Sequence, residues 1–138
     1  MSLLQFIEHN LLLVAVAVAS GAMLVWPYFR RASGGPWVTP AQATHLINRE
    51  DATIVDVREA SEFGAGHVLG ARNLPLARIE AAGADLAKRK AKPLIVYCET
   101  GDRSAKAAAV LRKQGFERVV NMAGGIKAWR EAGLPVEK

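Results

Sequence analysis

Hydrophobic residues follow two different patterns along the chain. An almost entirely apolar run extends from Leu11 to Phe29 and contains no charged residue. Its 19 residues approach the ~20 that an α-helix needs to cross the hydrocarbon core of a bilayer. After Arg30, short apolar runs alternate with amphipathic stretches, as in a folded domain. The pattern therefore predicts one membrane-spanning segment followed by an independent domain.

The residues that flank the apolar run favour an uncleaved anchor over a secretory signal peptide. A signal peptide carries Lys or Arg ahead of its apolar core, whereas Glu8 is the only charged side chain here and Arg30 and Arg31 follow the run. The triplet Ala15-Val16-Ala17 resembles a cleavage site but falls too early in the run. Basic flanks stay in the cytoplasm. We therefore expect a single pass through the inner or plasma membrane, with the N-terminus outside and the domain cytoplasmic.

Three regions are expected from these patterns. Residues 1–31 form the transmembrane anchor, in which Leu11–Phe29 contacts the lipid bilayer. Residues 32–36, Ala-Ser-Gly-Gly-Pro, form a short flexible linker. Residues 37–138 form the folded domain, which is long enough to bury its own core.

Two features of the anchor region suggest how it sits in the membrane. Trp26, Tyr28 and Trp37 lie where an aromatic belt and its surroundings are expected. Small residues four positions apart, such as Ala17 and Gly21, are compatible with a weak dimer formed through the anchors.

Strand and helix patterns alternate through residues 37–138. A capping Thr39 followed by Pro40 predicts the start of the first helix, which ends near Asp51. The predicted strands are Thr53–Val57, Leu94–Tyr97, Val119–Met122 and, more weakly, Ala71–Leu74. The other predicted helices are Ala84–Lys90, Ser104–Gln114 and Gly125–Ala132. This alternation predicts an α/β domain with a mainly parallel sheet flanked by helices on both faces.

Charge and cysteine content narrow the classes of function. All 18 Lys and Arg lie at or after Arg30, against 12 of the 13 acidic residues, so this part carries a formal charge of +6. The signs are mixed along the chain, and the one basic cluster, 88–92, is read as a solvated helix end or as a surface facing anionic lipid headgroups. We therefore expect no nucleic-acid partner. One cysteine and three scattered histidines predict neither a disulfide nor a metal site.

The single cysteine follows a predicted buried strand, at the place where ligands bind in such sheets. Between Cys98 and the helix expected near Ser104 lies a short loop in which Gly101 supplies an unusual backbone torsion. Such a loop can point successive amides at the sulfur, which together with a helix N-terminus favours the thiolate over the thiol. Arg103 adds a positive charge. A structural cysteine that merely ends a core strand is the alternative reading.

The loop Cys98-Glu99-Thr100-Gly101-Asp102-Arg103-Ser104 resembles the active-site loop of rhodanese-like domains, Cys-x-x-Gly-x-Arg-Ser. Two further stretches support the resemblance. The upstream stretch, 56–75, contains Asp-Val-Arg-Glu-x-x-Glu-Phe and Gly-His-Val. The downstream stretch, 124–129, reads Gly-Gly-Ile-x-Ala-Trp. Together the three cover most of the chain from Thr39 to Pro135, whereas the apolar run lies outside the common domain.

The resemblance implies a sulfurtransferase. Cys98 would take a sulfane sulfur from a donor such as thiosulfate or a persulfide, hold it as a cysteine persulfide, and pass it to a thiol or cyanide-like acceptor. The substrate-binding residues would be Glu99, Thr100, Gly101, Asp102, Arg103 and Ser104, with their amides around the sulfur and Arg103 assisting an anionic donor. No cofactor and no metal is implied. Asp56, Arg58 and His67 are expected to be structural, and Trp129 to be core packing.

Two other functions remain open from the sequence. Cysteine-dependent phosphatases use Cys-x5-Arg, but Arg103 lies one position earlier, which predicts a narrower loop than a phosphate needs. The second alternative is a catalytically weak docking module at the membrane. Glu99 and Asp102 favour it to a degree, because two acids beside the cysteine weaken binding of doubly charged thiosulfate.

Overall fold

The computed structural model of the chain describes residues 2–33 and 35–138. It contains two units, Met1–Ala32 and Ser33–Lys138. In chain order the elements are α1 (Leu3–His9), α2 (Leu11–Ser33), β1 (Trp37–Val38), α3 (Pro40–Glu50), β2 (Thr53–Asp56), α4 (Ala60–Ala65), β3 (His67–Val68), β4 (Arg72–Asn73), η1 (Leu76–Ala81), α5 (Ala82–Asp85), η2 (Ala87–Arg89), β5 (Leu94–Tyr97), α6 (Asp102–Lys113), β6 (Val119–Met122), α7 (Gly125–Glu131) and β7 (Val136–Glu137).

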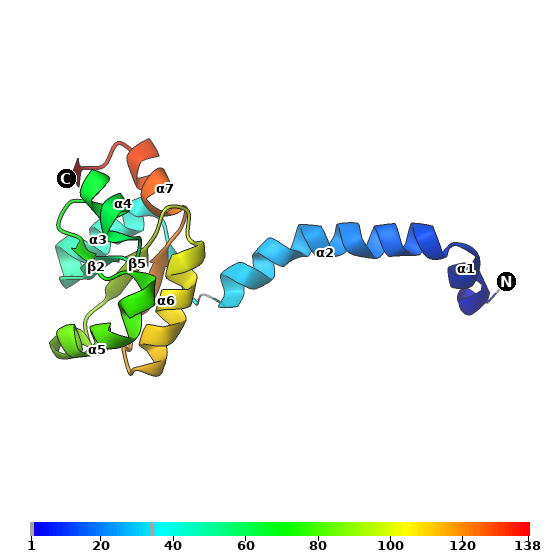
Figure 1. Ribbon diagram of the computed structural model, residues 1–138, viewed down its shortest axis with the longest axis horizontal. Helices are drawn as coiled ribbons and strands as arrows, with labels where there is room; N and C mark the ends of the chain where they lie inside the picture. The colour runs from blue at the N-terminus through cyan, green and yellow to red at the C-terminus, as the bar shows by residue number, and fades with distance from the viewer. Residues whose placement is uncertain (1, 34) are drawn as a thin grey trace. The chain divides into compact units, whose positions relative to one another are not determined.

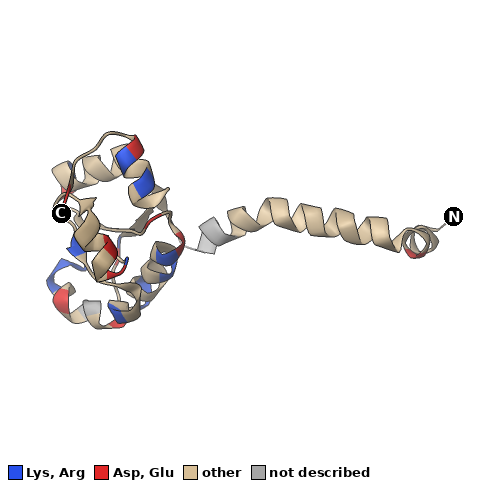
Figure 2. Ribbon diagram, turned by 45° about the horizontal axis from the view of Figure 1, so that its top comes forward, with Lys and Arg blue, Asp and Glu red and all other residues tan. Residues whose placement is uncertain are grey.

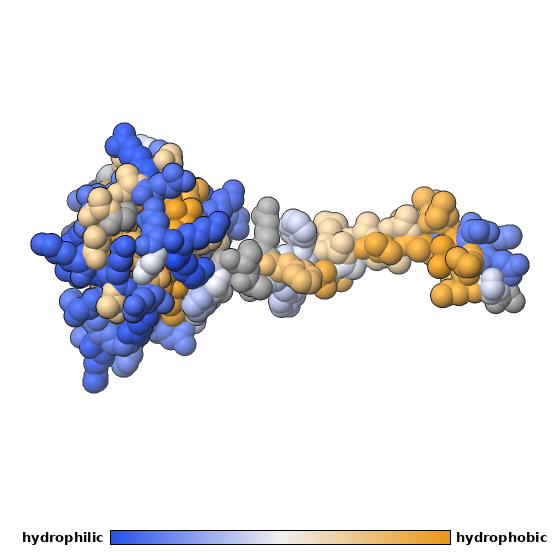
Figure 3. Space-filling view, turned by 90° about the horizontal axis from the view of Figure 1, so that it is seen from below, coloured by the Kyte–Doolittle hydropathy of each residue, from blue (hydrophilic) through white to orange (hydrophobic). Residues whose placement is uncertain are grey.

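The first unit consists of the helices α1 and α2. Within α2, the stretch Leu11–Phe29 has a mean hydropathy of 2.0 and none of it is buried. Charged side chains are absent from this stretch, which is tan in Figure 2 and mostly orange in Figure 3. Among the described residues, one helix is thus long and apolar enough to cross a membrane, a property that an uncleaved anchor and a signal sequence share.

The residues expected to form the linker differ from a simple flexible segment. Ala32 and Ser33 continue α2, and Gly34 of the linker, like Met1 of the anchor, lies outside the described residues. Pro36 is tied to the sheet, because its carbonyl accepts a hydrogen bond of 3.0 Å from the Asn121 N–H.

The second unit is built on a five-stranded sheet of order β1-β6-β5-β2-β4. Each pair of neighbouring strands is parallel. A separate two-stranded antiparallel sheet pairs β3 with β7. The predicted α/β class with a mainly parallel sheet is confirmed.

Alternating side chains of the central strands feed two hydrophobic cores. Along β5, Leu94 and Val96 enter a core that η1 and α6 cover, with Ile79 and Leu111. Ile95 and Tyr97 enter the opposite core, to which α3 contributes Ala43 and α7 contributes Ile126 and Trp129. Figure 1 shows α6 and α5 together near one end of the domain and α7 and α4 near the other. Helices therefore cover both faces of the sheet, as expected.

Several predicted elements match the structure and others do not. The strands Leu94–Tyr97 and Val119–Met122 and the helix capped by Thr39 are confirmed. The single helix predicted over Ala84–Lys90 is wrong, because α5 ends at Asp85 and Ala87–Arg89 form the separate 3₁₀ helix η2. Within Ala84–Lys90 only Leu86 is buried, so this segment has no apolar stripe to hold a continuous helix against the core.

Candidate active site

Cys98 lies directly after β5, at the carboxyl end of the parallel sheet. It continues the alternation of Leu94 and Val96 and therefore points into their core, where it is 1% exposed. Its Sγ accepts a hydrogen bond of 3.0 Å from the Gly101 N–H and lies 3.4 Å from the Ser104 hydroxyl. The helix α6 begins four residues after it, at Asp102, which is two positions earlier than predicted. The sulfur therefore faces a backbone amide donor close to a helix N-terminus.

Gly101 has the backbone torsion that the loop requires. Its φ of +123° lies in the region that favours glycine, which confirms the expectation from the sequence. A Cβ at this position would lie 3.1 Å from Cζ3 of Trp37, so the indole packs against the loop. Trp37 lies in β1 and packs against this site; its expected place near an aromatic belt stays a prediction.

Ser104 and Asn121 hold the other side of Gly101. The Ser104 Oγ lies 2.6 Å from Oδ1 of Asn121 and 3.1 Å from the Gly101 carbonyl oxygen. The Asn121 Nδ2 donates a bond of 3.2 Å to the same carbonyl. Asn121 comes from β6 and is fully buried. The sequence analysis did not single it out, since a lone Asn in a short strand gives no signal by itself.

Arg103 forms a bidentate ion pair with Glu62 that was not predicted from the sequence. Its Nη1 and Nη2 lie 2.7 and 2.9 Å from the two carboxylate oxygens of Glu62, in α4. Hydrogen bonding to Arg103 lowers the pKa of Glu62 from 4.5 to about 2, and the pKa of Arg103 is raised in turn. The positive charge of Arg103, which was expected to attract an anionic donor, is thus already balanced by Glu62. Glu62 belongs to the upstream stretch of the resemblance, which was its only sequence signal.

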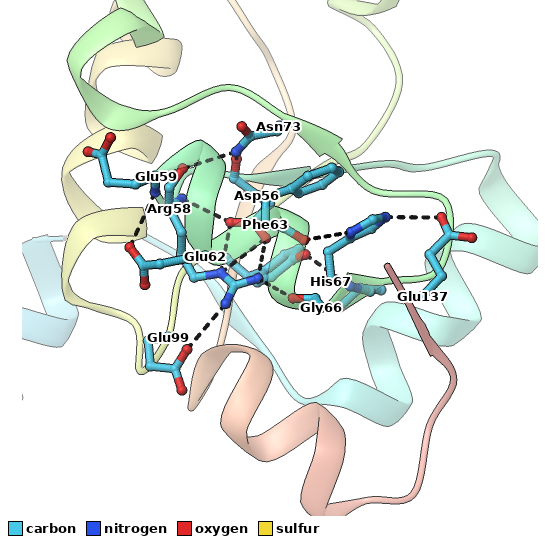
Figure 4. A network of polar contacts seen from close by, with 12 residues as sticks. Asp56, Arg58, Glu59, Glu62, Phe63, Gly66, His67, Asn73, Glu99 and Glu137 are labelled. Carbon is cyan, nitrogen blue, oxygen red and sulfur yellow. Dashed lines mark hydrogen bonds and ion pairs between the residues drawn. The ribbon is translucent and has the colours of Figure 1, made fainter.

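Arg58 forms a second connection between the segment that follows β2 and the active-site loop. Its guanidinium is buried against the carboxylate of Asp56 at 2.7 Å and donates to the Gly66 carbonyl at 2.7 Å. It also reaches Glu99 at 3.4 Å. Figure 4 shows Arg58 between the carboxylates of Asp56 and Glu99. Burial, the largest single influence, opposes the charge of Arg58, but the hydrogen bond to Asp56 and the negative charges of Asp56 and Glu99 together raise its pKa. Arg130 approaches Glu99 from α7 at 4.0 Å.

The residues expected to be structural are found in structural roles. His67 is buried, and its ring nitrogens contact the Phe63 carbonyl at 2.9 Å and Glu137 at 3.2 Å. Trp129 is buried in the core, where its Nε1–H donates to the Pro135 carbonyl. Within the described residues no group of three His, Cys, Asp or Glu side chains is placed to hold a metal ion.

The remaining loop residues lie at the surface of the site. Glu99 is half-buried, while Thr100 and Asp102 are exposed. In the described part of the chain, Gly101 supplies the amide hydrogen bond to Sγ. That the amides of Glu99, Thr100, Asp102, Arg103 and Ser104 also surround a transferred sulfur stays a prediction.

Comparison with known proteins places this geometry in a family. The rhodanese-like domain model matches residues 39–132. YibN of Escherichia coli (strain K12) is 35% identical over 136 residues, which cover 97% of this chain and 95% of YibN. The thiosulfate sulfurtransferase GlpE of Pseudomonas putida (strain GB-1) is 40% identical over 102 residues, 72% of this chain and 88% of GlpE.

A solved structure gives the same result. The solution NMR structure of the rhodanese-like domain of Alr3790 from Anabaena sp. superposes with a TM-score of 0.67 at 30% identity, covering 74% of this chain and 78% of that chain. The chain therefore belongs to the rhodanese-like domain family.

Proposed function

We propose that the chain is a sulfurtransferase in which Cys98 carries a sulfane sulfur as a persulfide. The observation that carries this proposal is the position of Sγ, at the end of β5 with the Gly101 N–H donating to it at 3.0 Å. An amide donor in a buried site stabilises negative charge on sulfur, both on the attacking thiolate and on the persulfide. The relative named thiosulfate sulfurtransferase supports the activity at the level of the family.

The reaction has two displacement steps at sulfur. In the first, the Cys98 thiolate attacks the sulfane sulfur of the donor, a sulfur–sulfur bond forms, and the donor leaves with the electron pair of its broken bond. Thiosulfate would leave as sulfite and a persulfide as a thiolate. In the second step, a thiolate or cyanide attacks the outer sulfur and the Cys98 thiolate is released. No external oxidant or reductant is needed, because the sulfane sulfur passes unchanged between nucleophiles.

The charges around Cys98 favour a persulfide over thiosulfate as the donor. Arg103 is paired with Glu62, and Arg58 is paired with Asp56 and Glu99. Asp102 adds an exposed negative charge next to the loop. A doubly charged anion therefore meets arginines that are already neutralised. We infer that thiosulfate is turned over slowly and that a protein or low-molecular-weight persulfide is the better donor.

Mass spectrometry of the full-length protein tests this function. After incubation with a persulfide donor, Cys98 should gain the mass of one sulfur atom, and a thiol acceptor should remove it. Cys98→Ser should abolish the gain, whereas Thr53→Val, at the other end of the sheet, should retain it. If no donor adds sulfur to Cys98, the enzymatic proposal fails. If Cys98→Ser also complements a deletion strain fully, a docking role at the membrane replaces it.

We propose further that α2 anchors the domain in the membrane, with the domain in the cytoplasm. The support is the apolar length of Leu11–Phe29 and the basic residues Arg30 and Arg31 after it. Two exposed ends allow a test in a Cys98→Ser background. Ser2→Cys should react with a membrane-impermeant maleimide in intact cells, and Lys138→Cys should react only after the membrane is opened. The reverse result would invert the orientation, and loss of residues 1–31 from the mature protein would identify a signal peptide.

A further inference from the structure

Asn121 lies beneath the active-site loop without touching the sulfur. Its side chain spans the gap between Ser104 and the Gly101 carbonyl, with contacts of 2.6 and 3.2 Å. Asn121 and Ser104 are both 0% exposed and Cys98 is 1% exposed. Because bulk water does not reach these groups, their hydrogen bonds must be satisfied among themselves.

Counting protons fixes the direction of each bond. The Gly101 carbonyl can only accept, so the Asn121 atom facing it is the amide nitrogen. The amide oxygen therefore faces Ser104, and a separation of 2.6 Å between two oxygens requires the hydroxyl proton between them. The other neighbours of this hydroxyl are farther away, the Gly101 carbonyl at 3.1 Å and Sγ at 3.4 Å. The Ser104 hydroxyl has one proton to donate, and its shortest contact, to Oδ1 of Asn121, takes that proton.

We propose that Asn121 is a positioning residue that keeps the Ser104 proton away from Cys98. Ser104 then presents lone pairs to Sγ, which accept a hydrogen bond from a thiol and repel a thiolate. The Gly101 N–H acts in the opposite sense, because it favours the thiolate. Asn121 therefore sets the balance between the two forms of the resting sulfur. A resting thiol reacts slowly with oxidants and alkylating agents, so Asn121 limits damage to the empty site.

The charged groups around the Cys98 sulfur are the same in the wild-type protein and in a variant that lacks the Asn121 amide. They are Glu99 beside Cys98, Asp102 and Arg103 at the start of α6, Arg58 and Glu62 from the β2–α4 segment, and Arg130 from α7. Replacing Asn121 changes none of these charges. Its proposed effect on Cys98 is therefore exerted through the Ser104 proton.

The rate at which iodoacetamide alkylates Cys98 as a function of pH tests the proposal. The full-length protein in nonionic detergent has one cysteine, so the midpoint of the rate belongs to Cys98. Asn121→Val suits a strand, removes the amide, and frees the Ser104 hydroxyl to donate to the thiolate. A hydrogen bond gained by a charged acceptor should lower the midpoint by about one pH unit, which is about a tenfold faster reaction on the acid side.

A double-mutant cycle shows whether Asn121 acts through Ser104. In a Ser104→Ala background, Asn121→Val should leave the midpoint unchanged. The matched control Thr53→Val also removes a side-chain hydrogen bond, the part-buried one from Arg89, and should leave the midpoint at the wild-type value. Circular dichroism confirms that each variant is folded.

An unchanged or higher midpoint in folded Asn121→Val overturns the proposal. So does a shift of the same size in the Ser104→Ala background. If Asn121→Val does not fold, Ser104→Ala alone decides: a lower midpoint supports the proposal, an unchanged midpoint overturns it, and a rise of about one unit overturns it by showing that the hydroxyl already donates to the thiolate. The inference concerns the sulfur of the proposed sulfurtransferase, but the alkylation contains no sulfur donor. Failure to form a persulfide and failure of the Asn121 shift are therefore separate results.

Discussion

The ion pair between Glu62 and Arg103 connects α4 to the active-site loop, and its removal should affect both stability and donor binding. The guanidinium meets both carboxylate oxygens, at 2.7 and 2.9 Å. Glu62→Gln keeps the shape of the side chain and removes its charge. We expect the variant to be less stable and to bind anionic donors more tightly.

The size of the stability effect follows from the pKa of Glu62. Hydrogen bonding to Arg103 lowers this pKa from 4.5 to about 2, which would correspond to about 3 kcal/mol for a buried pair. The two side chains are 34% and 36% exposed, and solvent screening reduces the contribution to about 1 kcal/mol. Because the folded-state pKa is depressed, this stability is present above pH 4.5 and is lost as the pH falls toward 2.

Thermal unfolding of the full-length protein in nonionic detergent, followed by near-ultraviolet circular dichroism, measures this contribution. At neutral pH, Glu62→Gln should lower Tm by about 4 °C, and the difference should narrow as the pH is lowered through the range in which Glu62 titrates. The matched control is Glu50→Gln, which breaks a surface pair with Arg118 at 2.9 Å and should lower Tm less.

The same variant should lower KM for thiosulfate, since Arg103 loses its counter-charge beside Cys98. A change of about threefold is expected for a half-exposed charge, and Glu50→Gln should show none. If Tm and KM both stay at the wild-type values, the pair contributes nothing measurable. The reasoning that Glu62 masks Arg103 would then be refuted.

Two further variants probe the loop. Glu99→Gln should lower KM for thiosulfate by about twofold, a small effect because Arg58 and Arg130 already offset the carboxylate. Steady-state kinetics measure the change, with Glu117→Gln as a control remote from the site. An unchanged or higher KM would contradict the electrostatic argument. Gly125→Ala places a Cβ against the Cys98 and Glu99 carbonyl oxygens and should cost about 3 kcal/mol or more. Gly70→Ala has a similar positive φ but open space around it, so it should cost only about 1 kcal/mol; equal losses of Tm would rule out the close contact as the cause.

Local sequence patterns were sufficient to predict those parts of the structure that depend on one strand or on one helix cap. Leu94–Tyr97 and Val119–Met122 are short β-branched or apolar runs that only a covered sheet can bury. The position of Cys98 then follows from the strand end, and the torsion of Gly101 from the loop length. Each of these inferences uses residues that are close together in the sequence.

Polar pairs between residues that are far apart in the sequence could not be predicted from such patterns. Glu62 and Arg103 are 41 positions apart, and Ser104 and Asn121 are 17 apart. No periodicity records which carboxylate will meet which guanidinium. The strands β3 and β7 were missed for a related reason: each has two residues, too few for an alternating pattern.

The short strand β1 determines where a mechanical load would enter the domain. Its pairing with β6 includes two backbone hydrogen bonds, from the Asn121 N–H to the Pro36 carbonyl and from the Ala123 N–H to the Val38 carbonyl. Since β1 is an edge strand and the first strand after α2 in the chain, tension from the N-terminal side would peel these two bonds before it reached the central strands. The Trp37 indole would leave Gly101 at that moment, while both hydrophobic cores were still closed. A pull on the chain from the N-terminal side would therefore loosen the sulfur loop before it unfolded the domain.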